Sequence, residues 1–136
     1  MAYRTSRPLR FGDCDPSGIA YFPSYLDLLV GVVEDFFAEL GFAWHDLVGR
    51  DRIGTPTLKL DILFSHPGFQ GDRLDFTLRV VGLGRSSLEL DHVVESGGRR
   101  LWACRQKLVA TSLETHRSTA WPDALRAALT AHLEEP

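Results

Sequence analysis

Apolar residues recur at steps of three and four between residues 23 and 40, which is the period of a helix with one buried face. The pattern predicts a helix that begins at Pro23, because proline suits the first turn, and ends before Gly41, a frequent helix stop. Its apolar stripe is broad, so we expect a curved sheet to cover it on more than one side. Gly31 lowers helix propensity by about 1 kcal/mol relative to alanine, and a closely approaching strand would explain its presence.

Later in the chain the pattern changes to alternation of apolar and polar residues, the period of a strand with one buried face. Alternation runs through residues 58–64, 74–80 and 88–94. In the first of these runs the expected buried face comprises Leu58, Leu60, Ile62 and Phe64. Glycine-rich turns separate the runs and fit an antiparallel meander: His66-Pro67-Gly68, Gly82-Leu83-Gly84 and Ser96-Gly97-Gly98.

Three further elements complete the prediction. A first strand covers about residues 3–11, with Pro8 best accommodated at a sheet edge or bulge. A last strand covers about residues 99–111, and residues 121–133 form a terminal helix with Pro122 near its start. Residues 41–56 are expected to form a loop. A strand, a long helix and then four strands give an α+β arrangement in which an antiparallel sheet covers the helix.

Length and composition narrow the class of protein. The 136 residues predict one domain, residues 1–136, with 44% hydrophobic and 24% charged residues, as in ordinary globular chains. A net charge of −3 gives no reason to expect nucleic acid as a partner. No apolar run approaches the roughly 20 residues of a membrane span, and the first residues lack the apolar core of a signal peptide. We therefore expect a cytoplasmic protein without membrane contact, in which Cys14 and Cys104 are free thiols.

Candidate chemistry concentrates in residues 11–25, FGDCDPSGIAYFPSY. Turn-forming residues precede the predicted helix, so Asp15 is expected near a helix N-terminus. Such a terminus has unpaired N–H groups and a positive dipole end, which can be capped by a carboxylate or can stabilise a developing oxyanion. From residue type alone, a structural cap is the simpler interpretation of Asp15. Asp13 is expected to shape the loop.

Cys14 stands between two carboxylates, which raise the pKa of a thiol and disfavour the reactive thiolate. No second cysteine or histidine stands at zinc-ligand spacing from it. We expect Cys14 to be a spectator, and we expect no metal site.

The run FGDCDPSGIAYFPSY resembles the active-site signature of hotdog-fold acyl-CoA thioesterases, in the group typified by the Pseudomonas-type 4-hydroxybenzoyl-CoA thioesterase. Gly54-Thr55-Pro56 resembles a second segment of that group's site. The resemblance implies a hotdog fold, in which an antiparallel sheet wraps around a long central helix. It also implies a homodimer or homotetramer whose protomers pair edge to edge with sites at their interface, an acyl-CoA substrate and no cofactor.

The resemblance also assigns roles in thioester hydrolysis. Asp15 corresponds to the catalytic carboxylate, either as a general base or as a nucleophile. The backbone N–H that polarises the thioester carbonyl falls near Tyr21 or Phe22, and we assign it to Phe22. Tyr21 and Tyr25, together with Phe22, are able to line an acyl pocket.

Two further residues match the family less specifically. Thr55 corresponds to a site threonine, although a Gly-Thr-Pro turn can be purely structural. Arg85 stands where the family has a more basic turn that holds coenzyme A phosphates; its planar guanidinium suits phosphate, but a solvated turn arginine explains it at least as well.

Substrate and function leave alternatives open. Pro23 replaces a histidine found in the related Tol-Pal-associated thioesterases, which favours aromatic acyl-CoA substrates, with short-chain acyl groups remaining possible. Hotdog dehydratases use a catalytic histidine in a different motif, which this chain lacks. The remaining alternative is a non-catalytic acyl-CoA-binding module, against which the presence of Asp15 argues.

Overall fold

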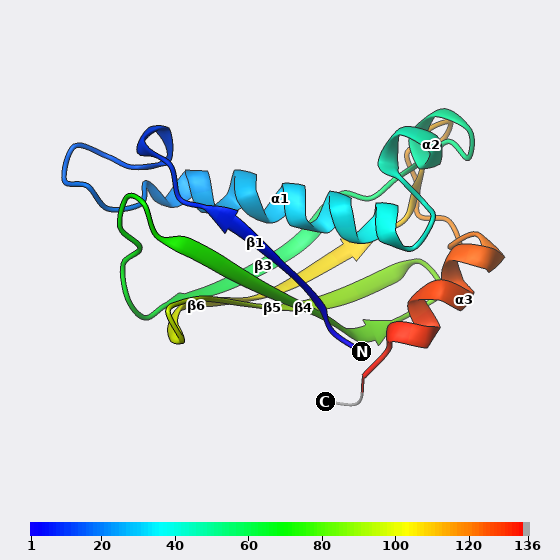
Figure 1. Cartoon of the computed structure of the whole chain (residues 1–136). Coiled ribbons are helices and arrows are strands. Elements are labelled where there is room, and N and C mark those ends of the chain that lie inside the picture. Colours follow the sequence, from blue (N-terminus) through cyan, green and yellow to red (C-terminus); the bar gives the residue numbers. More distant parts are fainter. Residues whose placement is uncertain (135–136) are drawn as a thin grey trace.

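The computed structural model describes residues 1–134 and contains a sheet crossed by one long helix (Figure 1). The elements in chain order are β1 (Tyr3–Pro8), a 3-10 turn (Phe11–Asp13), α1 (Phe22–Glu39), α2 (Trp44–Gly49), β2 (Ile53–Gly54), β3 (Thr57–Phe64), β4 (Arg73–Leu83), β5 (Ser87–Ser96), β6 (Arg99–Val109), β7 (Thr111–Ser112) and α3 (Asp123–His132).

Five antiparallel strands form the main sheet in the order β1-β4-β5-β6-β3, and β2 pairs with β7 in a separate two-stranded ribbon. The sheet curves beneath α1, which lies across one of its faces (Figure 1). The α+β class and the antiparallel sheet around a long helix are confirmed.

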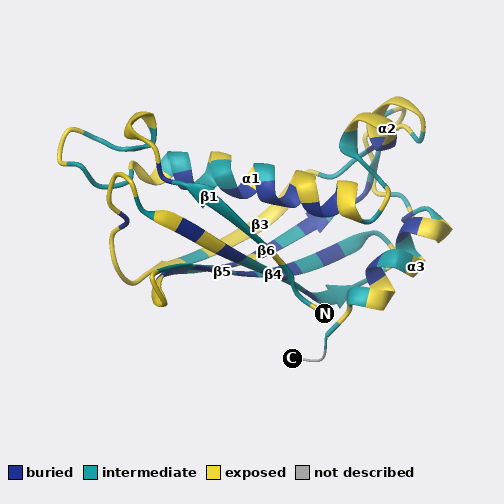
Figure 2. Cartoon of the chain, viewed as in Figure 1, coloured by how far each residue is buried: buried dark blue, intermediate teal, exposed yellow. Residues whose placement is uncertain are grey.

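The core fills the space between α1 and the sheet (Figure 2). Alternate residues of β4 and β5 are buried, as their sequence period predicts. The buried residues of α1 are Tyr25, Leu29, Val32, Val33, Phe36 and Phe37. Burying one such aliphatic or aromatic side chain contributes about 1.5–3 kcal/mol, so the interface between α1 and the sheet contributes strongly to the stability of the chain.

The predicted meander is correct for β4, β5 and β6 but wrong for β3. After β3 the chain crosses to β4, which pairs with β1 and β5, whereas β3 pairs with β6 at the opposite edge of the sheet. The turn His66-Pro67-Gly68 therefore begins a crossover between strands that do not pair. A glycine- and proline-rich sequence marks a turn in either case, which is why the pattern did not distinguish the two.

The predicted buried face of β3 is also wrong. Leu58 is 66% exposed, and Leu60 and Phe64 are exposed as well, so of this face only Ile62 is partly buried; Leu63, on the opposite face, is exposed as predicted. The strand lies at the sheet edge, and a bulge between Thr57 and Lys59 breaks the alternation at Leu58. Ile62 packs against the core and the ring of Phe64 packs on Tyr25 and Trp102, whereas Leu58 remains largely uncovered among the residues that the structure describes.

Smaller corrections concern element boundaries. The first strand ends at Pro8, on an edge strand as expected, and a 3-10 turn follows. The expected loop 41–56 contains α2, and the last predicted strand divides into β6 and β7. At Gly31 an added Cβ would meet no heavy atom within 4 Å, so the expected close approach of a strand is wrong.

The sheet has two ends with different contents. The loop end carries residues 9–21, residues 65–72 and the β5–β6 hairpin; Gly71 N donates to Leu9 O there at 2.9 Å. The far end carries α2, α3 and the β4–β5 turn, where Trp121 N donates to Arg85 O at 3.1 Å (Figure 1). No helix within residues 1–134 is both long and apolar enough to span a membrane.

Candidate active site

Residues 9–21 fold into a closed loop that leads the chain to the start of α1. Asp15 N donates to Ile19 O at 3.0 Å, and Tyr21 N donates to Asp13 O at 2.9 Å. Gly18 closes the loop with a φ of +83°, a backbone conformation that residues with a Cβ rarely adopt. These bonds hold the backbone of the loop that carries Asp15, seven residues before α1 begins at Phe22.

Ser17 orients the carboxylate of Asp15. Asp15 Oδ1 accepts hydrogen bonds from Ser17 N at 2.8 Å and from Ser17 Oγ. No hydrogen bond to Asp15 Oδ2 is found among the described residues, so this oxygen remains available. Asp15 lines a hollow of about 380 Å³ together with Phe11, Cys14, Pro16, Gly18 and Gln70.

The N-terminus of α1 offers one backbone donor. Tyr21 is the N-cap without a side-chain capping bond, and Pro23 has no N–H to contribute. The amide of Tyr21 already donates to Asp13 O, whereas no acceptor for the amide of Phe22 is found within residues 1–134. Of the two sequence candidates, Phe22 is therefore the one whose N–H can meet a ligand at the positive end of the helix dipole.

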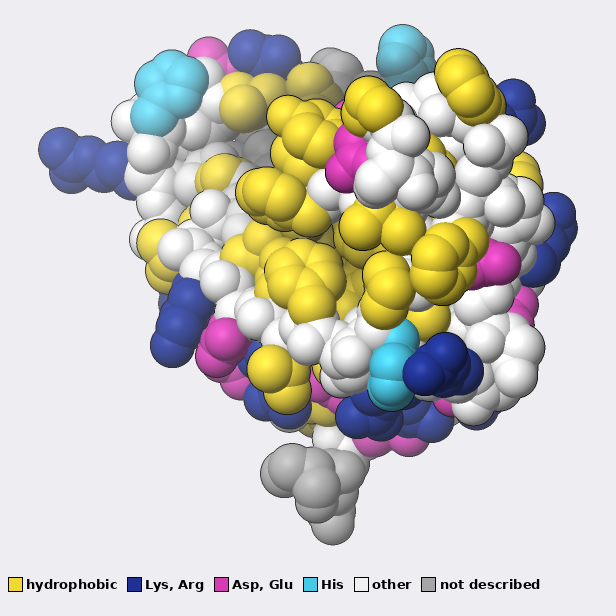
Figure 3. Space-filling view, turned by 90° about the vertical axis from the view of Figure 1, so that its left-hand side faces the viewer, with side chains coloured by type: hydrophobic (Ala, Val, Ile, Leu, Met, Phe, Trp, Pro, Cys, Tyr) yellow, Lys and Arg dark blue, Asp and Glu magenta, His cyan; other side chains and the backbone are white. Residues whose placement is uncertain are grey.

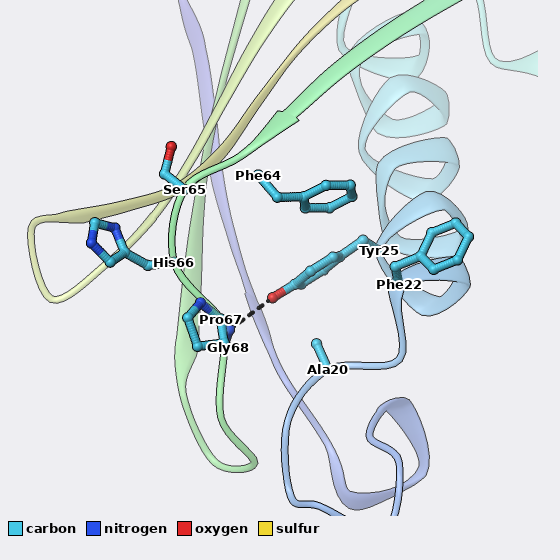
Figure 4. Close-up of a pocket in the computed structure, with 8 residues that line it drawn as sticks. All are labelled: Ala20, Phe22, Tyr25, Phe64, Ser65, His66, Pro67 and Gly68. Atoms are coloured by element: carbon cyan, nitrogen blue, oxygen red, sulfur yellow. Dashed lines mark hydrogen bonds between the residues drawn. The ribbon is translucent and has the colours of Figure 1, made fainter.

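A second hollow, of about 420 Å³, is lined in part by the aromatic side chains of Phe22, Tyr25 and Phe64 (Figure 4). The ring centroid of Phe64 lies 6.4 Å from that of Phe22 and 6.3 Å from that of Tyr25. The rest of the lining comprises Ala20, Ser65, His66, Pro67 and Gly68. Walls of this kind suit a planar apolar group.

Tyr25 carries a hydroxyl at this second hollow. Its Oη accepts a hydrogen bond from Gly68 N at 3.0 Å (Figure 4). Burial raises the pKa of Tyr25, and the bond from Gly68 offsets only part of that effect. The phenol therefore stays protonated at neutral pH.

Hydrophobic side chains gather over the loop end around a hollowed surface, with an acidic side chain among them and most other charged groups toward the margin (Figure 3). The large exposed hydrophobic residues that belong to this end are Phe11, Tyr21, Phe22, Phe64 and Phe69. Tyr21 is exposed and does not line either hollow. An exposed apolar surface of this kind marks a site for a ligand or for a second protein surface.

Thr55 and Arg85 lie away from this end within one chain. Thr55 precedes β3, and Phe64 at the other end of that strand contacts Phe22, so extended backbone of roughly 30 Å separates Thr55 from the aromatic hollow. Arg85 follows β4, whose first residue is paired with Pro8 at the loop end. The structure thus brings Phe22 and Tyr25 together at the aromatic hollow and places Asp15 in a second hollow of the same loop end, but it leaves Thr55 and Arg85 at the far end.

The structure adds a second cation to the turn of Arg85. The guanidinium of Arg126, on α3, donates to Gly84 O in that turn. Sequence reasoning missed Arg126 because it is 41 positions from Arg85 in the chain and carries no motif. The far-end turn is therefore more basic than its own sequence indicates.

Cys14 has the environment expected of a spectator. Burial raises the pKa of its thiol, and the nearby carboxylates of Asp13, Asp15 and Asp72 raise it further. No group of three or more His, Cys, Asp or Glu side chains arranged to hold a metal ion is found among residues 1–134.

Comparison with known sequences gives one family. Residues 9–129 match the model of the thioesterase-like superfamily. A 1,4-dihydroxy-2-naphthoyl-CoA hydrolase of Synechococcus elongatus is 25% identical over 125 residues, covering 91% of this chain and 92% of the relative. The 4-hydroxybenzoyl-CoA thioesterase of Pseudomonas sp. (strain CBS-3) is 36% identical over 58 residues, 41% of each chain.

Solved structures with the same fold include a 1,4-dihydroxy-2-naphthoyl-CoA thioesterase from Synechocystis, with a TM-score of 0.88 and 17% identity over 96% of each chain. A gentisyl-coenzyme A thioesterase aligns with a TM-score of 0.83 and 24% identity over 94% of this chain and 99% of its own. A Staphylococcus aureus protein in complex with CoA aligns with a TM-score of 0.92 and 15% identity, over 100% of this chain and 87% of its own. At these identities the likeness concerns the fold.

Proposed function

This chain belongs to the thioesterase-like superfamily and is an acyl-CoA thioesterase, and we propose that it hydrolyses aromatic acyl-CoA esters with Asp15 as the reacting carboxylate. The observation that carries the proposal is the loop-to-helix junction. There the Asp15 carboxylate, with a free Oδ2, stands seven residues before Phe22, whose N-terminal amide has no acceptor among the described residues and whose side chain lines the aromatic hollow.

Two facts support an aromatic substrate. Phe22, Tyr25 and Phe64 surround a hollow whose walls suit a planar ring. Relatives of this chain are named for aromatic acyl-CoA substrates, dihydroxynaphthoyl and hydroxybenzoyl. Short-chain acyl groups would fill the aromatic hollow less completely, so less apolar surface would be buried and the hydrophobic stabilisation would be smaller.

In the proposed reaction the acyl group occupies the aromatic hollow, and its thioester carbonyl accepts a hydrogen bond from Phe22 N–H. Attack on the acyl carbon turns the carbonyl oxygen into an oxyanion, which this amide and the α1 dipole stabilise. Removing one donor of this kind costs about 3 kcal/mol of transition-state stabilisation in other enzymes. The carbon–sulfur bond then breaks, and coenzyme A leaves as the thiol after taking up a proton.

Asp15 fits either of two roles in this step. As a general base its Oδ2 takes a proton from the attacking water, which adds directly to the acyl carbon. As a nucleophile its Oδ2 forms a mixed anhydride and expels the thiolate, and water then opens the anhydride to the free acid and the carboxylate. Ser17 holds Oδ1 in both cases, which keeps the second oxygen directed to the reaction.

We further propose that the whole described chain acts as one hotdog domain that works as a homodimer or as a dimer of dimers. The exposed edge strand β3 supports this proposal, because an uncovered apolar edge invites pairing with a second copy. Antiparallel pairing of two β3 strands would bring Thr55 of one copy near Phe64 and Phe22 of the other. Such a dimer would complete the site with the threonine that a single chain leaves at its far end.

The same pairing supports a role for Arg85 in binding coenzyme A. The far end of one copy would lie beside the loop end of the other, so Arg85 and Arg126 could meet the nucleotide phosphates of a substrate bound there. Guanidinium groups suit phosphate because they present several N–H donors in one plane.

A screen of acyl-CoA thioesters with detection of the free thiol tests the proposed function. We expect turnover with benzoyl or hydroxybenzoyl esters, and lower kcat/KM with acetyl and longer aliphatic esters. Binding of these esters without release of thiol would instead support the alternative of a non-catalytic acyl-CoA-binding module.

A further inference from the structure

The hydroxyl group of Tyr25 makes only half of the hydrogen bonds open to it. A phenol oxygen can accept from one donor while its own hydrogen donates elsewhere. Tyr25 Oη accepts from Gly68 N at 3.0 Å, and the described residues supply no acceptor for its hydrogen. Both Tyr25 and Gly68 line the aromatic hollow, so their hydrogen bond lies at its wall (Figure 4).

The surroundings hold this hydroxyl in place. The ring of Tyr25 stacks on Phe64 with an interplanar angle of 25°, and its centroid lies 5.2 Å from that of Trp102. At Gly68 an added Cβ would lie 2.5 Å from Tyr25 Oη, so only glycine permits the present approach of backbone to phenol. A donor fixed in this way can discriminate between ligands that differ by one oxygen.

Other polar side chains of the hollow are turned elsewhere. Ser65 and His66 point away from the ring pair of Phe64 and Tyr25 (Figure 4). His66 Nδ1 lies 3.0 Å from Arg100 O, which ties the imidazole to β6. Among the polar side chains that line the hollow, Tyr25 is thus the one whose ring also forms part of its aromatic wall, with its hydroxyl at the Gly68 side of that wall (Figure 4).

We propose that the Tyr25 hydroxyl, fixed by Gly68 N, donates a hydrogen bond to an oxygen on the ring of the bound acyl group and so selects hydroxylated aromatic acyl-CoA over the unsubstituted ester. This proposal rests on the proposed function, with the thioester at Phe22 N–H and the ring in the aromatic hollow. A ring without oxygen would leave the hydroxyl donor unpaired in a buried place, so the unsubstituted ester would bind with a less favourable free energy than the hydroxylated ester.

The test compares kcat/KM for benzoyl-CoA with that for 2-, 3- and 4-hydroxybenzoyl-CoA in the wild type and in Tyr25→Phe. The variant keeps the ring stack and removes only the hydroxyl. We expect the wild type to prefer at least one hydroxylated isomer by about tenfold, as for one neutral hydrogen bond, and we expect Tyr25→Phe to lose that preference. Tyr3→Phe is the matched control, because Tyr3 packs against Phe36 away from the hollow and should keep the preference.

Equal losses on benzoyl and hydroxybenzoyl esters in Tyr25→Phe would overturn the proposal and assign the hydroxyl to folding alone. If Tyr25→Phe does not fold, the wild type still decides, because equal kcat/KM for benzoyl-CoA and all three isomers would also overturn it. Either result leaves the proposed function standing as long as the wild type releases thiol from benzoyl-CoA. Absence of thiol release from every ester would contradict the proposed function itself.

Discussion

His92 is a buried histidine that the proposed reaction does not use. It lies on β5 in the core, with Nε2 2.8 Å from Gln106 Oε1, and Gln106 Nε2 in turn donates to Thr57 Oγ1 at 3.0 Å. Its Nδ1 is buried without a partner among the described residues. Burial lowers the pKa of His92 from 6.5 to about 4, against a smaller opposing effect of Gln106, so the imidazole is neutral in the folded protein.

This lowered pKa predicts a loss of stability in mild acid. Above pH 6.5 His92 is neutral in both the folded and the unfolded chain, but between pH 6.5 and about 4 only the unfolded chain takes up the proton. The free energy of unfolding should therefore fall through this window, by up to about 3 kcal/mol, and the contribution of His92 should level off below it. Urea unfolding of the wild type and of His92→Leu at pH 7 and pH 4.5 measures the effect.

His92→Leu should lose less stability between the two pH values than the wild type, because the carboxylates are common to both proteins. An identical pH dependence in the two proteins would show that His92 does not titrate in this range.

Single residues differ in how far their sequence reveals them. Asp15 and Phe22 stand in a continuous motif, so their neighbourhood was predictable, although the hydrogen bond that occupies the Tyr21 amide was not. The Tyr25–Gly68 bond joins residues 43 positions apart, and no local pattern records it. The hydrogen bond from Arg126 to Gly84 O was likewise not predictable from the sequence, because it joins distant positions that only the packing of the fold brings together.

At the scale of elements, the sequence pattern predicted α1 well but did not predict the exposure of β3. The helix was predicted to within one residue at each end, because nine apolar positions share its period. For β3 the alternation predicted the strand but not its exposure, because the same pattern occurs in a central strand and in an exposed edge strand.

The edge of β3 gives a prediction about assembly. In a two-fold antiparallel pair, a residue near the middle of the strand meets its own copy, and like charges directly opposite destabilise a sheet. We expect the wild type to scatter light as a dimer or tetramer and Leu60→Glu, near the middle of β3, to shift toward the monomer. Val48→Glu is the matched control, since Val48 is also an exposed apolar residue but lies on α2.

Dilution series by light scattering would check both variants, and thiol release would be assayed in parallel. A Leu60→Glu monomer with full thioesterase activity would contradict a site shared between copies.

At the scale of the whole molecule, the proposed site residues lie at two different ends of the sheet. The loop end holds Asp15, Phe22 and the aromatic hollow, whereas Thr55 and the Arg85 turn lie at the far end. The sequence motifs gave candidate site residues but not this separation, because a motif carries no information on which edge of the sheet a strand joins. Pairing of two copies through β3 would bring the two sets of residues together, so the catalytic activity would depend on dimer formation.

The most direct measurement of the central claim is turnover of the best aromatic acyl-CoA substrate by Asp15→Asn, together with binding of that substrate. The substitution keeps an oxygen that can accept from Ser17 but removes the charge needed for base or nucleophile. We predict that the variant binds the ester and loses at least about a hundredfold in kcat. Asp13→Asn, which keeps an acceptor for Arg10 N, should stay close to the wild type. Near-normal turnover by Asp15→Asn would contradict both proposed roles of Asp15.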